Sequence, residues 1–141
     1  MYLIGKVKLW FLMARKYKSW ELYMCLALNR LVMELDLDIY QEGLEEKLDS
    51  ILAQKDVKLP KSEISYEIKS NHQMTNKILN KLEEMGLIKI EFEDPSYNIS
   101  ITKEGVLYIR KYNEFYISMY EDIIRDHYKY RQIPAWFRMK E

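Results

Sequence analysis

One stretch, from Leu59 to Gly105, constrains the fold of this 141-residue chain more than any other part of it. A short run with helical spacing is followed by a polar break at residues 70–72, and then by a longer run whose apolar residues recur every three or four positions. Gly86 ends the longer run, because glycine enters the left-handed backbone region without the steric cost of a Cβ atom. Two runs of alternating apolar residues follow, and the turn-forming residues Asp94-Pro95-Ser96 separate them. The stretch therefore predicts two short helices, a hairpin and a further helix that is capped by Thr102.

The same spacing predicts which side chains face the core. The longer helix, at about residues 72–85, has its inner face at Met74, Ile78, Leu82 and Met85. The two strands of the hairpin direct inward Ile88, Ile90 and Phe92, and Tyr97, Ile99 and Ile101. A helix over residues 44–54 is expected to be the first helix of this core, and residues 57–59 are expected to form a short strand beside the hairpin. Two helices joined by a tight polar turn and followed by a hairpin make a winged helix-turn-helix.

The stretch also resembles a known family in three short motifs, which are Ser62-Glu63-Ile64, the run LEEMGLI at residues 82–88 and the run ITKEG at residues 101–105. These motifs are similar to the DNA-binding core of the winged-helix regulators of the MarR and PadR type. The resemblance implies a mainly α fold of the α+β kind, in which long N- and C-terminal helices form a dimerisation region around the winged core. It also implies a homodimeric, sequence-specific transcription regulator that binds double-stranded DNA, most simply a repressor. A small-molecule effector between the helical region and the core is a further implication, for which a plain hydrophobic interface is the alternative.

Polar side chains on and around the predicted recognition helix are candidates for contact with DNA. Gln and Asn side chains pair with adenine edges and Lys with guanine, while further lysines beside the helix hold phosphates. An ordinary solvated helix face is the alternative, since every winged helix has one. The candidates are Lys61, Lys69, Ser70, Asn71, His72, Gln73, Asn76, Lys77, Asn80 and Lys81, with Lys89 as a flanking residue.

The predicted hairpin departs from the family that the chain resembles. Wings of the MarR type usually carry an arginine near the tip, whereas residues 91–98 read EFEDPSYN, which is acidic and lacks arginine. Because phosphates repel such a tip, we expect at most Ser96 and Asn98 to touch DNA. The chain also carries 22 basic and 22 acidic residues, whereas nucleic-acid binders are usually basic. Both features favour an alternative function, a winged-helix module for protein–protein interaction in a transcription, replication or partition assembly.

Long apolar seams flank the predicted core on both sides. Residues 3–35 carry apolar side chains at three- and four-residue steps, which predicts one long helix or two collinear helices with Ser19 as the cap between them. A second seam predicts a helix over residues 103–132, ended by Pro134 and followed by a docked aromatic tail at Trp136-Phe137.

The chain is expected to be one compact unit built from three segments. Residues 1–40 form the dimerisation segment, residues 41–103 the winged core, and residues 104–141 the long C-terminal helix and its docking tail. The residues predicted at the dimer interface are Trp10, Met24, Leu28, Leu31, Ile109, Tyr112, Tyr116, Met119 and Ile123.

Nothing in the sequence predicts an enzyme, a metal site or a bound cofactor. His72 and His127 lack zinc-ligand spacing, and neither a glycine-rich phosphate loop nor a nucleophile motif is present. The lone Cys25 lies in an apolar pattern, which favours a buried side chain in a reducing compartment, the cytoplasm. No apolar run is long enough to span a bilayer, so membrane insertion is not expected. The basic residues between positions 6 and 18 are interpreted as a solvated helix face, with membrane-surface binding as a distant alternative.

Overall fold

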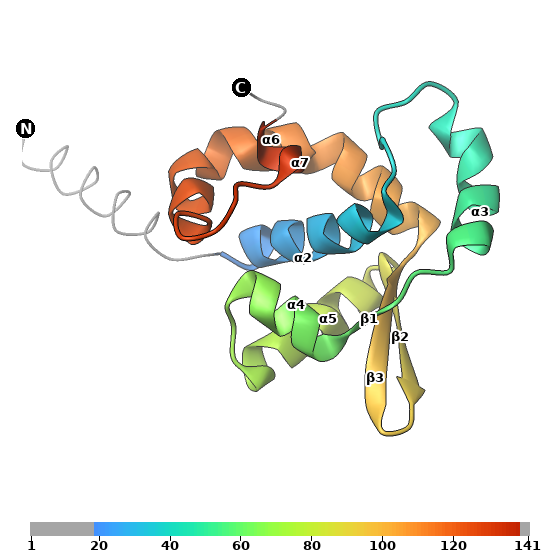
Figure 1. The fold of residues 1–141 in the computed structure, drawn as a ribbon, viewed down its shortest axis with the longest axis horizontal. Coiled ribbons are helices and arrows are strands. Elements are labelled where there is room, and N and C mark those ends of the chain that lie inside the picture. Colours follow the sequence, from blue (N-terminus) through green and yellow to red (C-terminus); the bar gives the residue numbers. More distant parts are fainter. Residues whose placement is uncertain (1–18, 139–141) are drawn as a thin grey trace, which may run out of the picture.

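The structure is a computed structural model, and it describes residues 19–138 of the chain. The helices are α2 (Trp20–Leu35), α3 (Leu44–Lys55), α4 (Lys61–Ile68), α5 (His72–Glu84), α6 (Lys103–His127) and α7 (Ala135–Arg138). The strands are β1 (Leu59–Pro60), β2 (Ile88–Glu93) and β3 (Ser96–Ile101). Figure 1 shows α2 between α6 on one side and the pair α4 and α5 on the other, with the β2–β3 hairpin projecting beside α5. The predicted class, mainly α with a winged helix-turn-helix, is confirmed.

The sheet is antiparallel, with β3 between β1 and β2. Ile99 of β3 lies opposite Ile90 of β2 and opposite Leu59 of β1, so the three side chains share one face of the sheet. Strand β1 begins at Leu59, the last residue of the strand predicted at residues 57–59, and includes Pro60. The alternation of apolar residues therefore predicted correctly that Ile90 and Ile99 share a face, while β1 starts two residues later than predicted.

Helix α3 stands directly before β1, as predicted for the first helix of the winged core, but α2 makes the larger contribution to the core. Helix α2 packs against α4, α5, α6 and β3, whereas α3 packs chiefly against α6, and Figure 1 places α3 at the outer edge of the molecule. The physical reason is the apolar surface that each helix offers: α2 is buried around most of its circumference, while α3 buries Leu44 and Leu48 among charged residues. The predicted helix at residues 44–54 is therefore present, directly before β1, and α2 fills more of the core than it does.

Helix α6 ends at His127 rather than near residue 132. Tyr120, with φ −121° and ψ 24°, interrupts the helical geometry, and after His127 the chain continues to α7, which lines a hollow together with the end of α2. The helix therefore stops before Pro134, the residue predicted to end it. The contacts that hold its end against α4 are described below. Trp136 and Phe137 are 7% and 1% exposed, which confirms the predicted docking of the aromatic tail.

Most of the seam predicted to contact a second subunit is buried within the single chain. The side chains concerned, all 9% exposed or less, are Met24, Leu28, Leu31, Ile109, Tyr116 and Ile123. A buried amide pair joins α2 to α6, because Asn29 and Asn113 each donate an Nδ2–H to the other's Oδ1, at 3.1 and 3.3 Å. The apolar faces of α2 and α6 pack against each other within one chain, so in this fold the six side chains are not available to a partner. Tyr112 and Met119 remain exposed, and Trp10 lies outside the described residues.

Two predicted helix caps are confirmed. Ser19 Oγ accepts a hydrogen bond from the Leu22 N–H at 3.2 Å, and Thr102 Oγ1 accepts one from the Gly105 N–H at 3.0 Å. A Cβ atom added to Gly105 would lie 2.1 Å from the Leu87 carbonyl oxygen. Only glycine therefore lets α6 begin against the end of the recognition helix.

Candidate nucleic-acid interface

The turn between α4 and α5 is built from local backbone and side-chain bonds. Lys69 ends α4 in the left-handed region at φ 53°, and Asn71 then caps α5, with its Oδ1 accepting from the Met74 N–H at 2.8 Å. Ser65 Oγ donates to Thr75 Oγ1 at 2.9 Å, which ties the two helices together behind the turn. These bonds give α5 a fixed direction relative to the rest of the core.

The inner face of α5 differs slightly from the predicted one. The buried side chains are Thr75, Ile78, Leu79 and Leu82. Met74 is half-buried, and Met85 is 43% exposed because it follows the last helical residue and projects past the core. The prediction of Met85 as an inner residue is therefore wrong.

The outer face of α5 carries four polar side chains that are open to solvent. Gln73, Lys77, Asn80 and Lys81 are all exposed, and they fall on one side of the helix by their spacing. Within residues 19–138, their side chains make no hydrogen bond and no ion pair. The sequence prediction that these residues face away from the core is confirmed, and the face presents two ammonium groups and two amides to whatever binds there.

Three other candidates hold α5 in place. Lys61 Nζ donates to Asn76 Oδ1 and also lies 4.7 Å from the centroid of the Tyr97 ring. Asn76 Nδ2 in turn lies 3.2 Å from His72 Nε2. Lys61, His72 and Asn76 thus form a chain of contacts from α4 across α5 to the wing, and their polar atoms are largely occupied.

The end of α6 is held against α4 by contacts that the sequence did not predict. Lys69 Nζ donates to the His127 carbonyl, and His127 Nε2 lies 2.6 Å from the Glu67 carbonyl oxygen. Tyr128 donates its hydroxyl hydrogen to Glu67 Oε2 at 2.6 Å. Burial raises the pKa of Tyr128, and the bond to Glu67 raises it further, so the phenol stays a donor. Lys69 therefore positions the turn, while Ser70 lies half-buried beside it.

Glu67 is the centre of this cluster. Besides Tyr128, it faces Arg30 Nε at 3.6 Å and Arg131 Nη1 at 3.7 Å. Sequence reasoning missed it because a glutamate on a short polar helix looks like a solvated residue. The available signal was the position of Tyr128 on an apolar edge of α6, since a buried phenol needs a polar partner.

The wing is acidic, and its charges are bound to one another. Lys58 Nζ lies 2.9 Å from Glu93 Oε1 and 3.4 Å from Glu91 Oε2. The hydrogen bond between Lys58 and Glu93 raises the pKa of the lysine and lowers that of the carboxyl group. Asn98 Nδ2 donates to Glu93 Oε2 at 2.8 Å, so this candidate DNA contact is turned toward the wing itself. Ser96 is exposed at the start of β3.

An aromatic pair lies near the tip of the wing. Phe92 and Tyr97, both predicted to point into the core, are 59% and 46% exposed. The prediction is wrong because the hairpin extends past the core, and the two rings pack on each other with centroids 5.0 Å apart.

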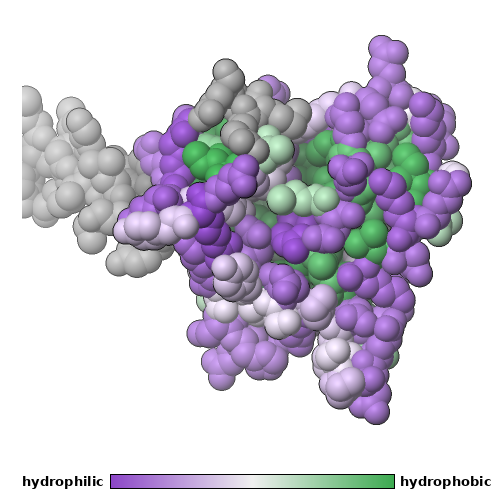
Figure 2. Space-filling model, viewed as in Figure 1, coloured by the Kyte–Doolittle hydropathy of each residue, from purple (hydrophilic) through white to green (hydrophobic). Residues whose placement is uncertain are grey.

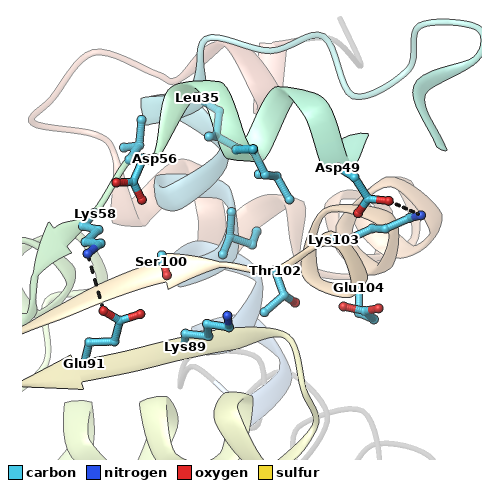
Figure 3. A pocket seen from close by; sticks show the side chains of 14 residues that line it. Leu35, Asp49, Asp56, Lys58, Lys89, Glu91, Ser100, Thr102, Lys103 and Glu104 are labelled. Atoms are coloured by element: carbon cyan, nitrogen blue, oxygen red, sulfur yellow. Dashed lines mark hydrogen bonds and ion pairs between the residues drawn. The ribbon is translucent and has the colours of Figure 1, made fainter. Parts of the chain in front are cut away.

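A hollow of about 410 Å³ separates the wing from α3. Figure 3 shows its ion pairs, Lys58 with Glu91 and Lys103 with Asp49, the latter at 3.4 Å. Lys89, proposed from sequence as a flank of the recognition helix, lies in this hollow on the sheet face toward α3. It is therefore separated from the outer face of α5 by the sheet.

The lone thiol belongs to the core. Cys25 is fully buried, and burial raises its pKa to about 12, so it remains a protonated thiol beside Asn113. The described residues contain no cluster of His, Cys, Asp or Glu side chains arranged to hold a metal ion. In the same part of the chain, no helix is both long and apolar enough to cross a membrane.

Comparisons with known proteins yield one structural similarity. No protein-family model and no curated protein matches the sequence. A matching solved structure is that of MepR, a transcription regulator of the multidrug efflux pump MepA of Staphylococcus aureus, with a TM-score of 0.40 and 15% sequence identity. The match covers 73% of this chain and 75% of MepR. At this TM-score the similarity carries no argument, so the winged-helix assignment rests on the order and packing of the elements described above.

Proposed function

We propose that this protein is a DNA-binding transcription regulator of the winged-helix class, most simply a repressor that occludes a promoter. The observation that carries the proposal is the outer face of α5, where two amides and two ammonium groups are exposed and bind no described residue. Amides pair with adenine edges, and ammonium groups bind guanine or phosphate, when a helix enters the major groove. The bonds of Asn71 and Thr75 hold that helix in one orientation, as groove binding requires.

Fluorescence anisotropy on an arbitrary duplex of about 20 base pairs tests this function. We expect micromolar binding at about 50 mM salt that weakens steeply by about 200 mM, because bound lysines release counterions from the DNA. The double variant Lys77→Ala/Lys81→Ala should weaken binding and reduce the slope of log affinity against log salt by about 2.

A matched control removes two exposed lysines elsewhere, in Lys47→Ala/Lys89→Ala. Neither side chain has a hydrogen-bond or ion-pair partner among the described residues, so their loss should leave DNA binding unchanged. Absence of binding by the unmodified protein at about 50 mM salt would count against the regulator.

We further propose that the protein acts as a homodimer through an exposed stripe on α6. Tyr112, Phe115 and Met119 are 37%, 55% and 44% exposed, and they follow one another on one side of the helix. Apolar stripes of this kind are typical of an interface. A two-fold dimer would place its recognition helices roughly 34 Å apart, which suits a pseudo-palindromic site.

Sedimentation velocity tests the dimer with a matched pair of variants. Phe115→Glu puts a charge in the stripe and should give a monomer. Tyr130→Glu alters a residue that is 86% exposed and lies beyond the end of α6, so it should sediment as the unmodified protein does. Equal sedimentation of all three proteins would remove the stripe from the proposal.

The segment boundaries are part of the same proposal. Residues 1–40, 41–103 and 104–141 remain the proposed segments, but the exposed stripe moves the proposed dimer contact from the first segment to the third. Since α2 packs against α4 and α5, the first two segments share one core, and we expect neither to fold alone.

A module for protein–protein interaction is the second candidate. The exposed pair Phe92 and Tyr97 on an acidic wing favours it, because aromatic rings are enriched at protein interfaces. If DNA binding is absent, affinity capture should recover a partner with the unmodified protein and lose it with Phe92→Ser/Tyr97→Ser. Retention of that partner by the variant would contradict this reading.

A further inference from the structure

A second hollow, of about 310 Å³, lies between the end of α2, the loop that follows it, the middle of α6 and α7. Its volume is in the range of small-molecule sites. On the face drawn in Figure 2, apolar side chains are open to solvent between α7 and that loop. The lining is quite different from that of the hollow beside the wing, whose walls carry several ion pairs.

The walls of this hollow are largely apolar. Val32, Leu37, Ile39 and Trp136 contribute buried or half-buried side chains. Met33 is 46% exposed and Tyr40 is 41% exposed, although both are large and mainly apolar. A flat ring placed among these side chains would remove apolar surface from water.

Two hydrogen-bond donors in the walls lack a good acceptor. The Tyr40 hydroxyl oxygen is 3.5 Å from Asn113 Nδ2, at the outer limit of a hydrogen bond in which the hydroxyl is the acceptor, so its own hydrogen is available. The buried Trp136 Nε1–H has no acceptor among the described residues, but it is also closed to solvent, so the Tyr40 hydroxyl is the donor that an occupant can reach.

The charge of the hollow is negative. Asp36 and Asp38 line it, and the described lining includes neither lysine nor arginine. Lys55 Nζ, the nearby cation, donates to the backbone carbonyls of Leu35 and Asp36 rather than to a carboxylate. Asp38 Oδ1 accepts from the Tyr40 N–H at 3.0 Å, which holds the loop at the rim. The field in the hollow therefore favours a cation.

We propose that this hollow binds a ring-sized organic cation that also carries a hydrogen-bond acceptor, such as an aromatic amide with an amine substituent. The ring packs against Met33 and Trp136, the ammonium group faces Asp36 and Asp38, and the amide oxygen accepts from the Tyr40 hydroxyl.

The hollow adjoins the contacts that hold the helix-turn-helix. Met33 and Ala135 also line a neighbouring hollow of about 320 Å³, whose other wall includes Glu67, Tyr128 and Arg131. An occupant thus lies beside the segment that fastens α6 to α4. A role of the occupant as an effector of DNA binding rests on the function proposed above. Binding of the occupant in the hollow does not rest on that function.

Nitrogen–proton correlation NMR on the full chain tests the site with three probes that differ in charge. We expect para-aminomethylbenzamide, the cation, to bind in the millimolar range, as suits a ligand of about ten heavy atoms. Neutral benzamide should bind roughly threefold to tenfold more weakly, and the anion para-carbamoylbenzoate should not bind detectably. The indole signal of Trp136 should shift on titration, while that of Trp20, which is outside the hollow, should stay in place.

Three variants assign the contacts. Asp36→Asn/Asp38→Asn should weaken the cation about threefold to tenfold and leave benzamide unchanged, and Asn is tolerated at the left-handed position 36. Tyr40→Phe should weaken both probes. Glu45→Gln/Glu46→Gln, which neutralises two exposed acids of α3 outside the lining, should change neither.

The outcomes separate this site from the DNA-binding function. Equal affinities for the three probes, shifts that spare Trp136, or no shift at saturating probe would overturn the site. Probe binding with the expected charge order in a protein that binds no DNA would support the site and contradict the regulator.

Discussion

The recognition helix and the wing are neighbours in the fold, but they differ in charge. The helix exposes lysines that are unpaired within residues 19–138, whereas the wing carries glutamates that are paired with a lysine. On α5, Lys77 and Lys81 are exposed and unpaired among the described residues. On the wing, Glu91 and Glu93 share Lys58, and Asn98 is bound to Glu93. A formal net charge of zero therefore hides a separation of charge between two adjacent surfaces. For binding to a polyanion, the distribution of charge decides more than its sum.

The comparison also separates side chains that are free to bind from side chains that maintain the fold. The outer face of α5 can make new contacts without losing old ones. Lys61, His72 and Asn76, which the sequence placed in the same group, would have to leave existing partners first. We therefore expect the energetic weight of DNA binding to lie at positions 73, 77, 80 and 81.

Charge reversal on the helix should have the largest effect. Lys77→Glu/Lys81→Glu replaces two attractive contacts by repulsion, so DNA affinity at about 50 mM salt should fall by at least about 100-fold. Anisotropy measures the loss, and circular dichroism checks that the fold is intact. A change of less than about threefold would mean that the outer face of α5 is not the DNA-binding surface.

Neutralising the wing should have the opposite and smaller effect. Glu91→Gln/Glu93→Gln removes two negative charges and frees Lys58, so DNA affinity should rise about tenfold, with a steeper dependence on salt. The same anisotropy assay measures it, and Glu45→Gln/Glu46→Gln on α3 is the control for net charge. An unchanged affinity would show that the wing stands clear of the duplex.

Removing the cap of the recognition helix should lower the stability of the fold without changing its charge. Asn71→Ala deletes the acceptor of the Met74 N–H, which should lower the free energy of unfolding by about 1 kcal/mol. Urea denaturation measures the change. Asn80→Ala, on the outer face of the same helix, should leave the free energy of unfolding within about 0.5 kcal/mol of the original. Equal losses in both variants would mean that the cap is not what holds the helix start.

The ion pair of the wing should produce the smallest effect, and it should depend on pH. The pKa of Glu93 lies below its ordinary value of 4.5 in the folded chain, so its contribution to stability is present above that value and is lost as the pH falls through the lowered pKa. The pKa of Lys58 lies above its ordinary value of 10.5, so its contribution is complete below that value and is lost at higher pH. The difference in Tm between the protein and Glu93→Gln should therefore be present at pH 7 and vanish in acid once the pH is below the lowered pKa of Glu93, and it should shrink with salt because both groups are exposed. A difference in Tm that persists unchanged in strong acid would exclude this pair as its source.

The elements that were predicted correctly depend on short-range rules. Gly86 and Thr102 mark the ends of helices through conformational and capping preferences that act over a few residues. Ile90 and Ile99 lie on the same face of the hairpin, as predicted, because a strand alternates its side chains whatever lies around it. The exposed set on α5 follows in the same way from helical spacing.

The predictions that failed concern which other part of the molecule a given side chain contacts. The apolar stripes of α2 and α6 have the same spacing whether they meet a second chain or each other, so the sequence could not show that Leu28 and Ile109 are buried within one chain. Helix α3 stands before β1 as predicted, but the sequence did not show that α2 offers the core a larger apolar surface. The polar candidates divide similarly, since whether a lysine is free or bound depends on residues far away in the chain, such as Tyr97 for Lys61.

The sequence by itself thus determined the kind of fold, the two confirmed helix caps, the alternation of faces along the hairpin and the polar face of the recognition helix, because each follows from interactions between residues close together in the chain. Only the tertiary structure decided which helix fills the core, which charges are neutralised, how the end of α6 holds α4, and where hollows remain. Those outcomes depend on contacts between distant segments, and a periodic pattern specifies that a face must be covered without specifying what covers it.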